Sequence, residues 1–237
     1  MMSTRLRLAI GSIVGLLALS ASGPHAGAVG AGSPVRLDLT ASAHPRSAFT
    51  PDNDFAYRVD AVAGVPVHAA ATATASATCQ GCSGTAISVQ VLYLDRPPVA
   101  KLDNAAIAWT QACEACRAFA VSVQVVRVRH AAYLEPANRA LAVTAACTRC
   151  RVTAAAYQLV VAGSGDSRLS GSTLRALDAW ASDQARRLRA ASRAGTSARN
   201  MRVVQSRSLG RIAHRVNAEL GTVTIATRAR LGTGSNK

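Results

Sequence analysis

The stretch TQACEACRAFAVSVQVV, Thr110 to Val126, contains a Cys-x-x-Cys motif followed by a run of alternating β-branched residues. The motif occurs three times in the chain, and successive copies begin 34 residues apart, at Cys79, Cys113 and Cys147. The flanks repeat as well, since a glutamine lies eight residues after the second cysteine of each copy, at Gln90, Gln124 and Gln158. A constant period over three copies indicates an internal structural repeat.

Strand periodicity surrounds each motif. Behind the second copy, Val121, Val123 and Val125 occupy alternate positions, which is the pattern of a β-strand rather than a helix. The segment in front of it alternates too, with Ile107 and Trp109 two residues apart. We therefore expect a strand on each side of every motif, with the motif itself forming a tight turn.

Two strands joined by a two-residue turn ordinarily pair as an antiparallel hairpin. In that arrangement Ala108 lies opposite Val121 and Trp109 opposite Ala120, so that large side chains face small ones. The expected fold class is α+β: three tandem CxxC-tipped antiparallel β-hairpins over residues 69–162 form a sheet or small sandwich, followed by two basic amphipathic helices. The Glu-Ala and Thr-Arg turn pairs are unfavourable for such hairpins, so another constraint must hold those tips closed.

Three kinds of chemistry are open to the cysteines. The residues flanking a two-residue turn have Cα atoms about 5.5 Å apart, which suits a disulfide. The favoured interpretation is three local disulfides, one within each motif. The alternatives are a thiol–disulfide redox centre, for which Arg117 and Arg151 could stabilise a thiolate, and a Cys₄ zinc site shared by two motifs. All of these use the same six residues, Cys79, Cys82, Cys113, Cys116, Cys147 and Cys150.

The first 68 residues predict export and a connecting segment. Residues 1–28 combine Arg5 and Arg7 with a short apolar run and a small-x-small site at Ala26, the pattern of a signal peptide. The remainder of the chain would then be secreted or associated with the cell envelope, in an environment that permits disulfides. Residues 29–68 are rich in Gly, Ala, Ser and Pro and predict a linker or loosely ordered arm.

Residues 163–237 form a basic segment. Leucine, valine and tryptophan at helical spacing predict two helices, one with Ser172 as its N-cap and one closed by Gly221. The whole chain has a net charge of +15, which favours an anionic polymer of the cell envelope or a lipid surface as partner, with nucleic acid a weaker alternative. The candidate anion-binding residues are Arg186, Arg187, Arg189, Arg193, Arg199 and Arg202.

No catalytic constellation is recognisable in the sequence. HExxH, Walker and GxGxxG motifs are absent, and Ser167 in a Gly-Asp-Ser segment lacks the downstream Asp-x-x-His pair that a serine esterase of that type needs. We therefore expect a non-enzymatic protein without a cofactor, acting as an envelope-associated binding or structural module. The alternative is a redox or zinc-binding protein that uses the CxxC motifs.

The repeat unit can be written Asn-x-Ala-x-Ala-x(4)-Cys-x-x-Cys followed by Ala-x-x-x-Gln-[Val/Leu]-Val, with Asn104 and Asn138 as its first residue in the second and third copies. This unit resembles a group of exported actinobacterial proteins that carry tandem CxxC repeats. The resemblance covers residues 69–162. It implies export and a repeated β unit, and it implies no particular activity.

Overall fold

From the first strand to the eighth, strands that follow one another in the sequence lie in different sheets. The computed structural model describes residues 33–235, so the expected signal peptide at residues 1–28 lies outside the described residues. The four-stranded sheet has the order β1-β3-β5-β7, with bounds Val35–Ala43, Val67–Ala77, Val99–Gln111 and Tyr133–Ala145. The five-stranded sheet has the order β2-β4-β6-β8-β9, with bounds Pro51–Ala63, Ser83–Asp95, Arg117–Arg129, Arg151–Ala162 and Val223–Ser235.

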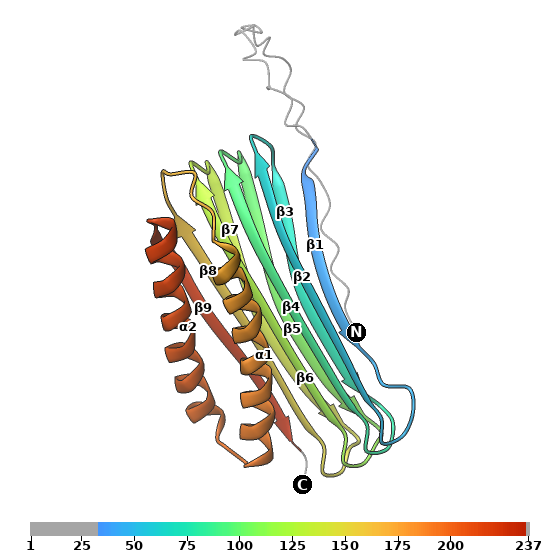
Figure 1. Cartoon of the computed structure of the whole chain (residues 1–237). Helices are drawn as coiled ribbons and strands as arrows, with labels where there is room; N and C mark the ends of the chain where they lie inside the picture. The colour runs from blue at the N-terminus through green and yellow to red at the C-terminus, as the bar shows by residue number, and fades with distance from the viewer. Residues whose placement is uncertain (1–32, 236–237) are drawn as a thin grey trace, which may run out of the picture. The chain divides into compact units, whose positions relative to one another are not determined.

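Strands within each sheet are parallel, apart from the antiparallel β9, and the pairs β4–β6, β5–β7 and β6–β8 are in register with the 34-residue repeat. Gln124 on β6 pairs with Gln90 on β4 and with Gln158 on β8, so equivalent residues of successive copies lie side by side. Each copy contributes one strand to each sheet, and the next copy adds its two strands beside them (Figure 1). This arrangement is a two-sheeted β-solenoid.

The expectation of three antiparallel hairpins is therefore wrong. Ala108 pairs with Ala75 and Ala142 in its own sheet, and not with Val121. The chain makes an arch at each motif, crossing from one sheet to the facing one.

Hydrogen bonds between successive copies explain why an arch forms at Glu-Ala and Thr-Arg. The N–H of Gly81 donates to the carbonyl of Glu114 at 2.8 Å, and that of Ala115 donates to the carbonyl of Thr148 at 2.9 Å. Gly81, Ala115 and Arg149 all have left-handed backbones, with φ of 63°, 56° and 56°. The turns thus bond to one another along the stack instead of closing hairpins, and turn residues suited to hairpins are not required.

The predicted linker also proves to be structured where it is described. Residues 33–68 contain β1 and β2, which extend the two sheets by parallel pairing with β3 and β4. Val35 pairs with Val67 and Pro51 with Ser83, an offset of 32 residues instead of 34. This first coil is shorter than the later copies and lacks the cysteine motif, which is why the repeat pattern misses it.

The space between the sheets is filled differently at its two ends. Near the motifs the inward-facing residues are almost all alanine, including Ala73, Ala75, Ala106, Ala108 and Ala120. Leucine and valine fill the other end, among them Leu92, Leu94, Leu102 and Val126. Small facing side chains let the two sheets approach closely at the motif end, where a Cβ on Gly84 would lie 2.4 Å from the carbonyl oxygen of Ser76.

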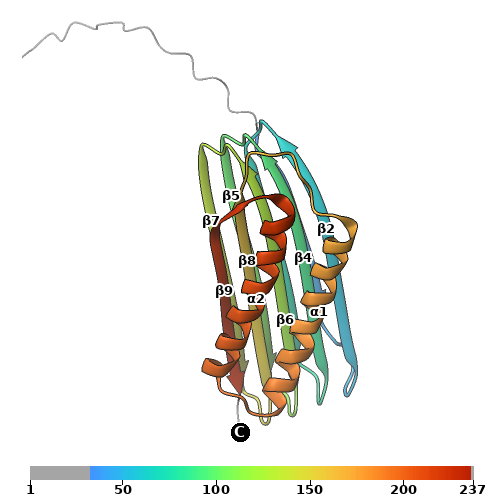
Figure 2. The ribbon, with the colours of Figure 1, turned by 60° about the vertical axis from the view of Figure 1, so that its left-hand side comes forward.

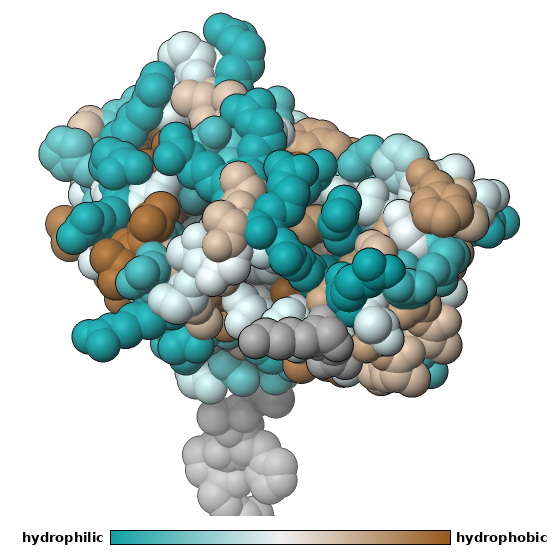
Figure 3. All heavy atoms as spheres, turned by 90° about the horizontal axis from the view of Figure 1, so that it is seen from below, coloured by the Kyte–Doolittle hydropathy of each residue, from teal (hydrophilic) through white to brown (hydrophobic). Residues whose placement is uncertain are grey.

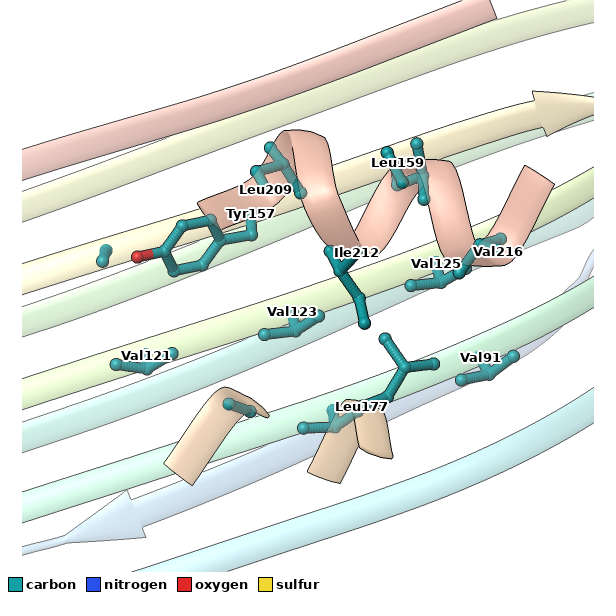
Figure 4. Close-up of a cluster of buried hydrophobic side chains, with 14 of the residues drawn as sticks. Val91, Val121, Val123, Val125, Tyr157, Leu159, Leu177, Leu209, Ile212 and Val216 are labelled. Carbon is teal, nitrogen blue, oxygen red and sulfur yellow. The ribbon is translucent and has the colours of Figure 1, made fainter. Parts of the chain in front are cut away.

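Two helices cover the outer face of the five-stranded sheet (Figure 2). They are α1, Gly171–Arg193, and α2, Ala198–Leu220. The N-cap of α1 is Ser170, whose hydroxyl accepts from the Thr173 N–H, and not the expected Ser172, while Gly221 ends α2 as expected with φ 60°. Leu177, Ile212 and Val216 pack on the valine rows of the sheet, such as Val91, Val123 and Val125 (Figure 4). Within the described residues, neither helix has the length and hydropathy needed to cross a membrane.

Candidate functional site

Buried polar ladders run between the sheets. Gln158 donates to the side-chain oxygen of Gln124 at 2.8 Å, Gln124 donates to Gln90 at 2.9 Å, and Gln90 donates to the carbonyl of Leu37 at 2.6 Å. On the facing sheet, Asn104 donates to Asn138 at 2.7 Å. These amides are fully or nearly fully buried, so a shift in strand register would leave them without partners. The sequence shows their 34-residue spacing but does not by itself reveal this role.

The six cysteines form a second ladder, which we call the cysteine ladder. The sulfurs pair within each motif at bonding distance, as Cys79–Cys82, Cys113–Cys116 and Cys147–Cys150. The arches stack them closely, since the sulfur of Cys113 lies 3.4 Å from that of Cys147. Local pairing therefore agrees with the favoured interpretation of the sequence, although the motif closes an arch and not a hairpin tip.

Burial limits what the cysteine ladder can do in its oxidised form. Cys82, Cys116 and Cys150 are fully buried, and Cys113 and Cys147 are nearly so. Hydrophilic side chains dominate the face at this end of the solenoid, as the view from below shows (Figure 3). The Cys113–Cys116 and Cys147–Cys150 disulfides are thereby shielded from a macromolecular reductant, whereas Cys79 of the first disulfide is only half-buried. This environment is typical of structural disulfides.

A reduced form of the ladder would have different chemistry. The sulfurs of Cys113, Cys116 and Cys150 all lie within 4.8 Å of one another, which is close enough for three thiolates to hold one metal ion. Thiolate ligands select zinc or soft monovalent copper. The grouping combines two neighbouring motifs, as the zinc interpretation of the sequence requires, but it contains three sulfurs where that interpretation expects four.

Exposed arginines line the solvent side of the two helices. We call this set the arginine layer: Arg175, Arg186, Arg187, Arg193, Arg199, Arg202, Arg207, Arg211 and Arg215. The helices contain only three acidic residues, Asp178, Asp183 and Glu219, and none of these is exposed. The helical face therefore carries most of the excess positive charge of the described chain.

Not all of the predicted anion-binding residues are equivalent. Arg186 and Arg187 both pair with Asp183, and the hydrogen bond from Arg187 holds the pKa of that carboxyl below its usual range. Arg189 is half-buried with its guanidinium 5.9 Å from the centre of the Phe119 ring, and burial lowers its pKa. Arg193, Arg199 and Arg202 are exposed and form no ion pair with any described carboxylate.

The outer face of the four-stranded sheet offers a contrast. Its charges neutralise one another, since Lys101 lies 3.8 Å from Glu135 and Arg139 pairs with Asp103. A shallow depression of about 400 Å³ on this face is lined by both of these pairs. The face shows no preference for one sign of charge, so an anionic partner is better matched by the arginine layer.

Comparison with known proteins gives no lead. No family model, no curated protein and no solved structure matches this chain.

Proposed function

We propose that this protein is an exported, non-enzymatic binding module that holds a linear anionic polymer on its arginine layer. The observation that carries the proposal is the unbalanced charge of the two helices. Six exposed arginines in the layer, Arg175, Arg193, Arg199, Arg202, Arg207 and Arg211, form no ion pair with a carboxylate in the described chain. Guanidinium groups bind phosphate and carboxylate groups through paired hydrogen bonds, and such arginines are suited to that role.

The geometry favours a polymer over insertion into a bilayer. Each helix has 23 residues and is therefore about 35 Å long, which gives a basic strip able to contact many repeating units at once. The apolar stripes of both helices, including Leu177 and Val216, are already buried against the sheet. An amphipathic helix that enters a membrane needs such a stripe free. Of the apolar residues of α2, Val203 and Val204 are 45% and 50% exposed, so a membrane contact of this surface would be mainly electrostatic, with a small apolar contribution.

Charge reversal on the helices tests the proposal with inorganic polyphosphate as the probe. In the triple variant Arg199→Glu, Arg207→Glu, Arg211→Glu, we expect affinity to fall by about tenfold or more at moderate salt, because each lost phosphate contact weakens binding and its salt dependence. The matched control reverses Arg36, Lys101 and Arg139 on the four-stranded sheet and changes the net charge equally. Binding that both triple variants weaken to the same degree, or binding insensitive to salt, contradicts the proposal.

Phosphatidylglycerol vesicles distinguish the source of the anion. We expect weaker retention on vesicles than on polyphosphate at equal phosphate concentration, because only one side of the helix pair can face a flat surface. Tighter retention on vesicles would make a lipid surface the partner and would overturn the polymer assignment.

A second candidate function rests on the grouping of Cys113, Cys116 and Cys150. In this alternative the reduced protein binds zinc or takes part in thiol–disulfide exchange. The test is to purify the protein without reductant, denature it, and titrate its free thiols. The absence of reactive thiols favours the disulfide scaffold. Two or more free thiols, together with one zinc per chain by metal analysis, favour the alternative.

A further inference from the structure

The two ends of the solenoid expose complementary strands. β2 and β9 are the terminal strands of the five-stranded sheet, and no described strand pairs with their outer edges. Each is 13 residues long. An unpaired strand of this length presents a row of backbone N–H and C=O groups to which another chain can add.

Charged side chains already cover part of the edges of the four-stranded sheet. At the end of β1, the backbone N–H of Ser42 donates to Asp54 and that of His44, the residue after the strand, donates to Asp52, both at 2.6 Å. At the other edge, Arg228 on β9 donates to the carbonyl of Pro136 on β7 at 2.9 Å. Side chains of β2 and β9 thus occupy part of each edge of the four-stranded sheet, which makes the five-stranded sheet the better candidate for extension.

The side chains that face the solenoid interior have opposite signs on the two terminal strands. By register with β4, this row of β2 contains Asp52, Asp54, Arg58 and Asp60. The corresponding row of β9 contains Arg228 and Arg230, by register with Gln158 and Ala156. Two β2 ends repel each other, and so do two β9 ends. A β2 end and a β9 end attract.

The side chains of β2 and β9 that face the helices are also complementary in size where they stand at the same position along the strands. Following the registers across β4, β6 and β8 places Phe55 level with Leu231, Tyr57 with Ala229, and Val59 with Thr227. Phe55, Tyr57 and Val59 are 43%, 38% and 39% exposed, so β2 ends with a partly uncovered apolar row. If the strands met, its largest residue, Tyr57, would face a small one.

We propose that copies of this protein assemble head to tail, with β2 of one copy pairing antiparallel to β9 of the next. The pairing is antiparallel because β9 runs opposite to every other strand of its sheet, and a translated copy keeps its own orientation. Across the junction Arg230 lies diagonal to Asp54 and Arg228 diagonal to Asp60, within reach of long side chains. Arg228 also faces Arg58, which is held by Asp60 at 2.9 Å. A heterologous contact of this kind does not close on itself, so it generates open filaments.

Two end-specific variants test this assembly. Tyr57→Lys places a charge in the apolar row of β2, and the double variant Arg228→Asp, Arg230→Asp gives β9 the same sign as β2. We expect the wild type to show a mass that rises with concentration in sedimentation velocity, and each variant alone to stay monomeric over the same range. An equimolar mixture of the two variants retains one intact β2 end and one intact β9 end, so it should form a heterodimer and nothing larger.

The matched control is Ile107→Lys, which adds a lysine to a half-buried apolar position on the outer face of β5, an inner strand of the four-stranded sheet that lies at neither end of the solenoid. It should assemble like the wild type, and circular dichroism should show all variants folded. A wild type that remains monomeric at several hundred micromolar overturns the proposal. So does a homodimer of either variant, or a mixture that stays monomeric.

Discussion

The two sheets are built from the same number of repeats but meet solvent differently. The strands of the five-stranded sheet that lie under the helices, β4, β6 and β8, are buried almost without interruption, whereas β5 and β7 largely alternate between more buried inward residues and more exposed outward ones, among them Lys101, Arg139 and Leu141. The cause is the helical cover, which lies on one sheet only. The same coil thus contributes one strand to a closed interior layer and one to a bare surface, and stability is concentrated on the covered side.

The largest expected effect compares the two outer faces by truncating leucines. Leu177 on α1 is fully buried over the sheet, so Leu177→Ala should lower the free energy of unfolding by about 2–5 kcal/mol. Leu141 on β7 is 55% exposed, so Leu141→Ala should change it by less than about 0.5 kcal/mol. Urea unfolding followed by circular dichroism measures both. Equal losses would mean that the bare face is covered in solution.

The glutamine ladder gives the next largest effect. Gln124→Ala removes the partner of both Gln90 and Gln158 and leaves a small cavity, so we expect a loss of about 2–4 kcal/mol. Thr72→Ala, on the bare face, serves as the control and should be nearly neutral. If the two substitutions cost the same, the ladder does not fix the register.

A stabilising change sharpens the account of the arches. Ala115 has φ 56°, a conformation that costs an alanine about 1–2 kcal/mol and a glycine very little. Ala115→Gly should therefore raise the free energy of unfolding by about 0.5–1 kcal/mol, after allowing for the greater entropy of an unfolded glycine. The control, Ala137→Gly within β7, should lower it. A loss of stability in Ala115→Gly would show that the arch differs from the one described.

The smallest expected effect is on the pH dependence of the free energy of unfolding, and it compares one ion pair on each sheet. Arg129 donates two hydrogen bonds of 2.7 Å to Asp95 on the five-stranded sheet, and this contact lowers the pKa of Asp95. Because the folded pKa lies below the unfolded one, the stabilisation is present above the unfolded pKa near 4 and is lost as pH falls through the folded value. Asp95→Asn should flatten the acid side of the stability profile below the unfolded pKa, and Glu135→Gln, whose partner Lys101 is 3.8 Å away, serves as the control on the four-stranded sheet. An unchanged stability profile in Asp95→Asn would show that the contact between Asp95 and Arg129 does not contribute to the pH dependence.

Much of the local structure follows from the sequence alone. Alternating residues such as Val121 and Val123 predict the strands, the spacing of the cysteines predicts turns with local disulfides, and the leucine and valine stripes predict both helices. These features depend on neighbours in the chain, which is why a single sequence reveals them.

How the strands pair could not be deduced in the same way. A hairpin and an arch both reverse the chain over a few residues, and alternation alone does not say whether Ala108 pairs with Val121 or with Ala75 and Ala142 of the neighbouring copies. The distinguishing signal is the recurrence of Gln90, Gln124 and Gln158, because identical amides stack only when copies lie parallel and in register. The first coil escaped prediction because its prolines and its 32-residue offset hide it. The sequence did not reveal which predicted anion-binding arginines are accessible, and only the structure shows that Arg189 points towards the sheet.

The central claim is that equivalent residues of successive copies are neighbours, and nuclear magnetic resonance tests it most directly. In a NOESY spectrum of isotope-labelled protein, the account predicts contacts between the side-chain amide protons of Gln124 and those of both Gln90 and Gln158, together with backbone contacts between Val121 and Ile87. Backbone contacts between Ala108 and Val121, without contacts among the glutamines, would contradict it.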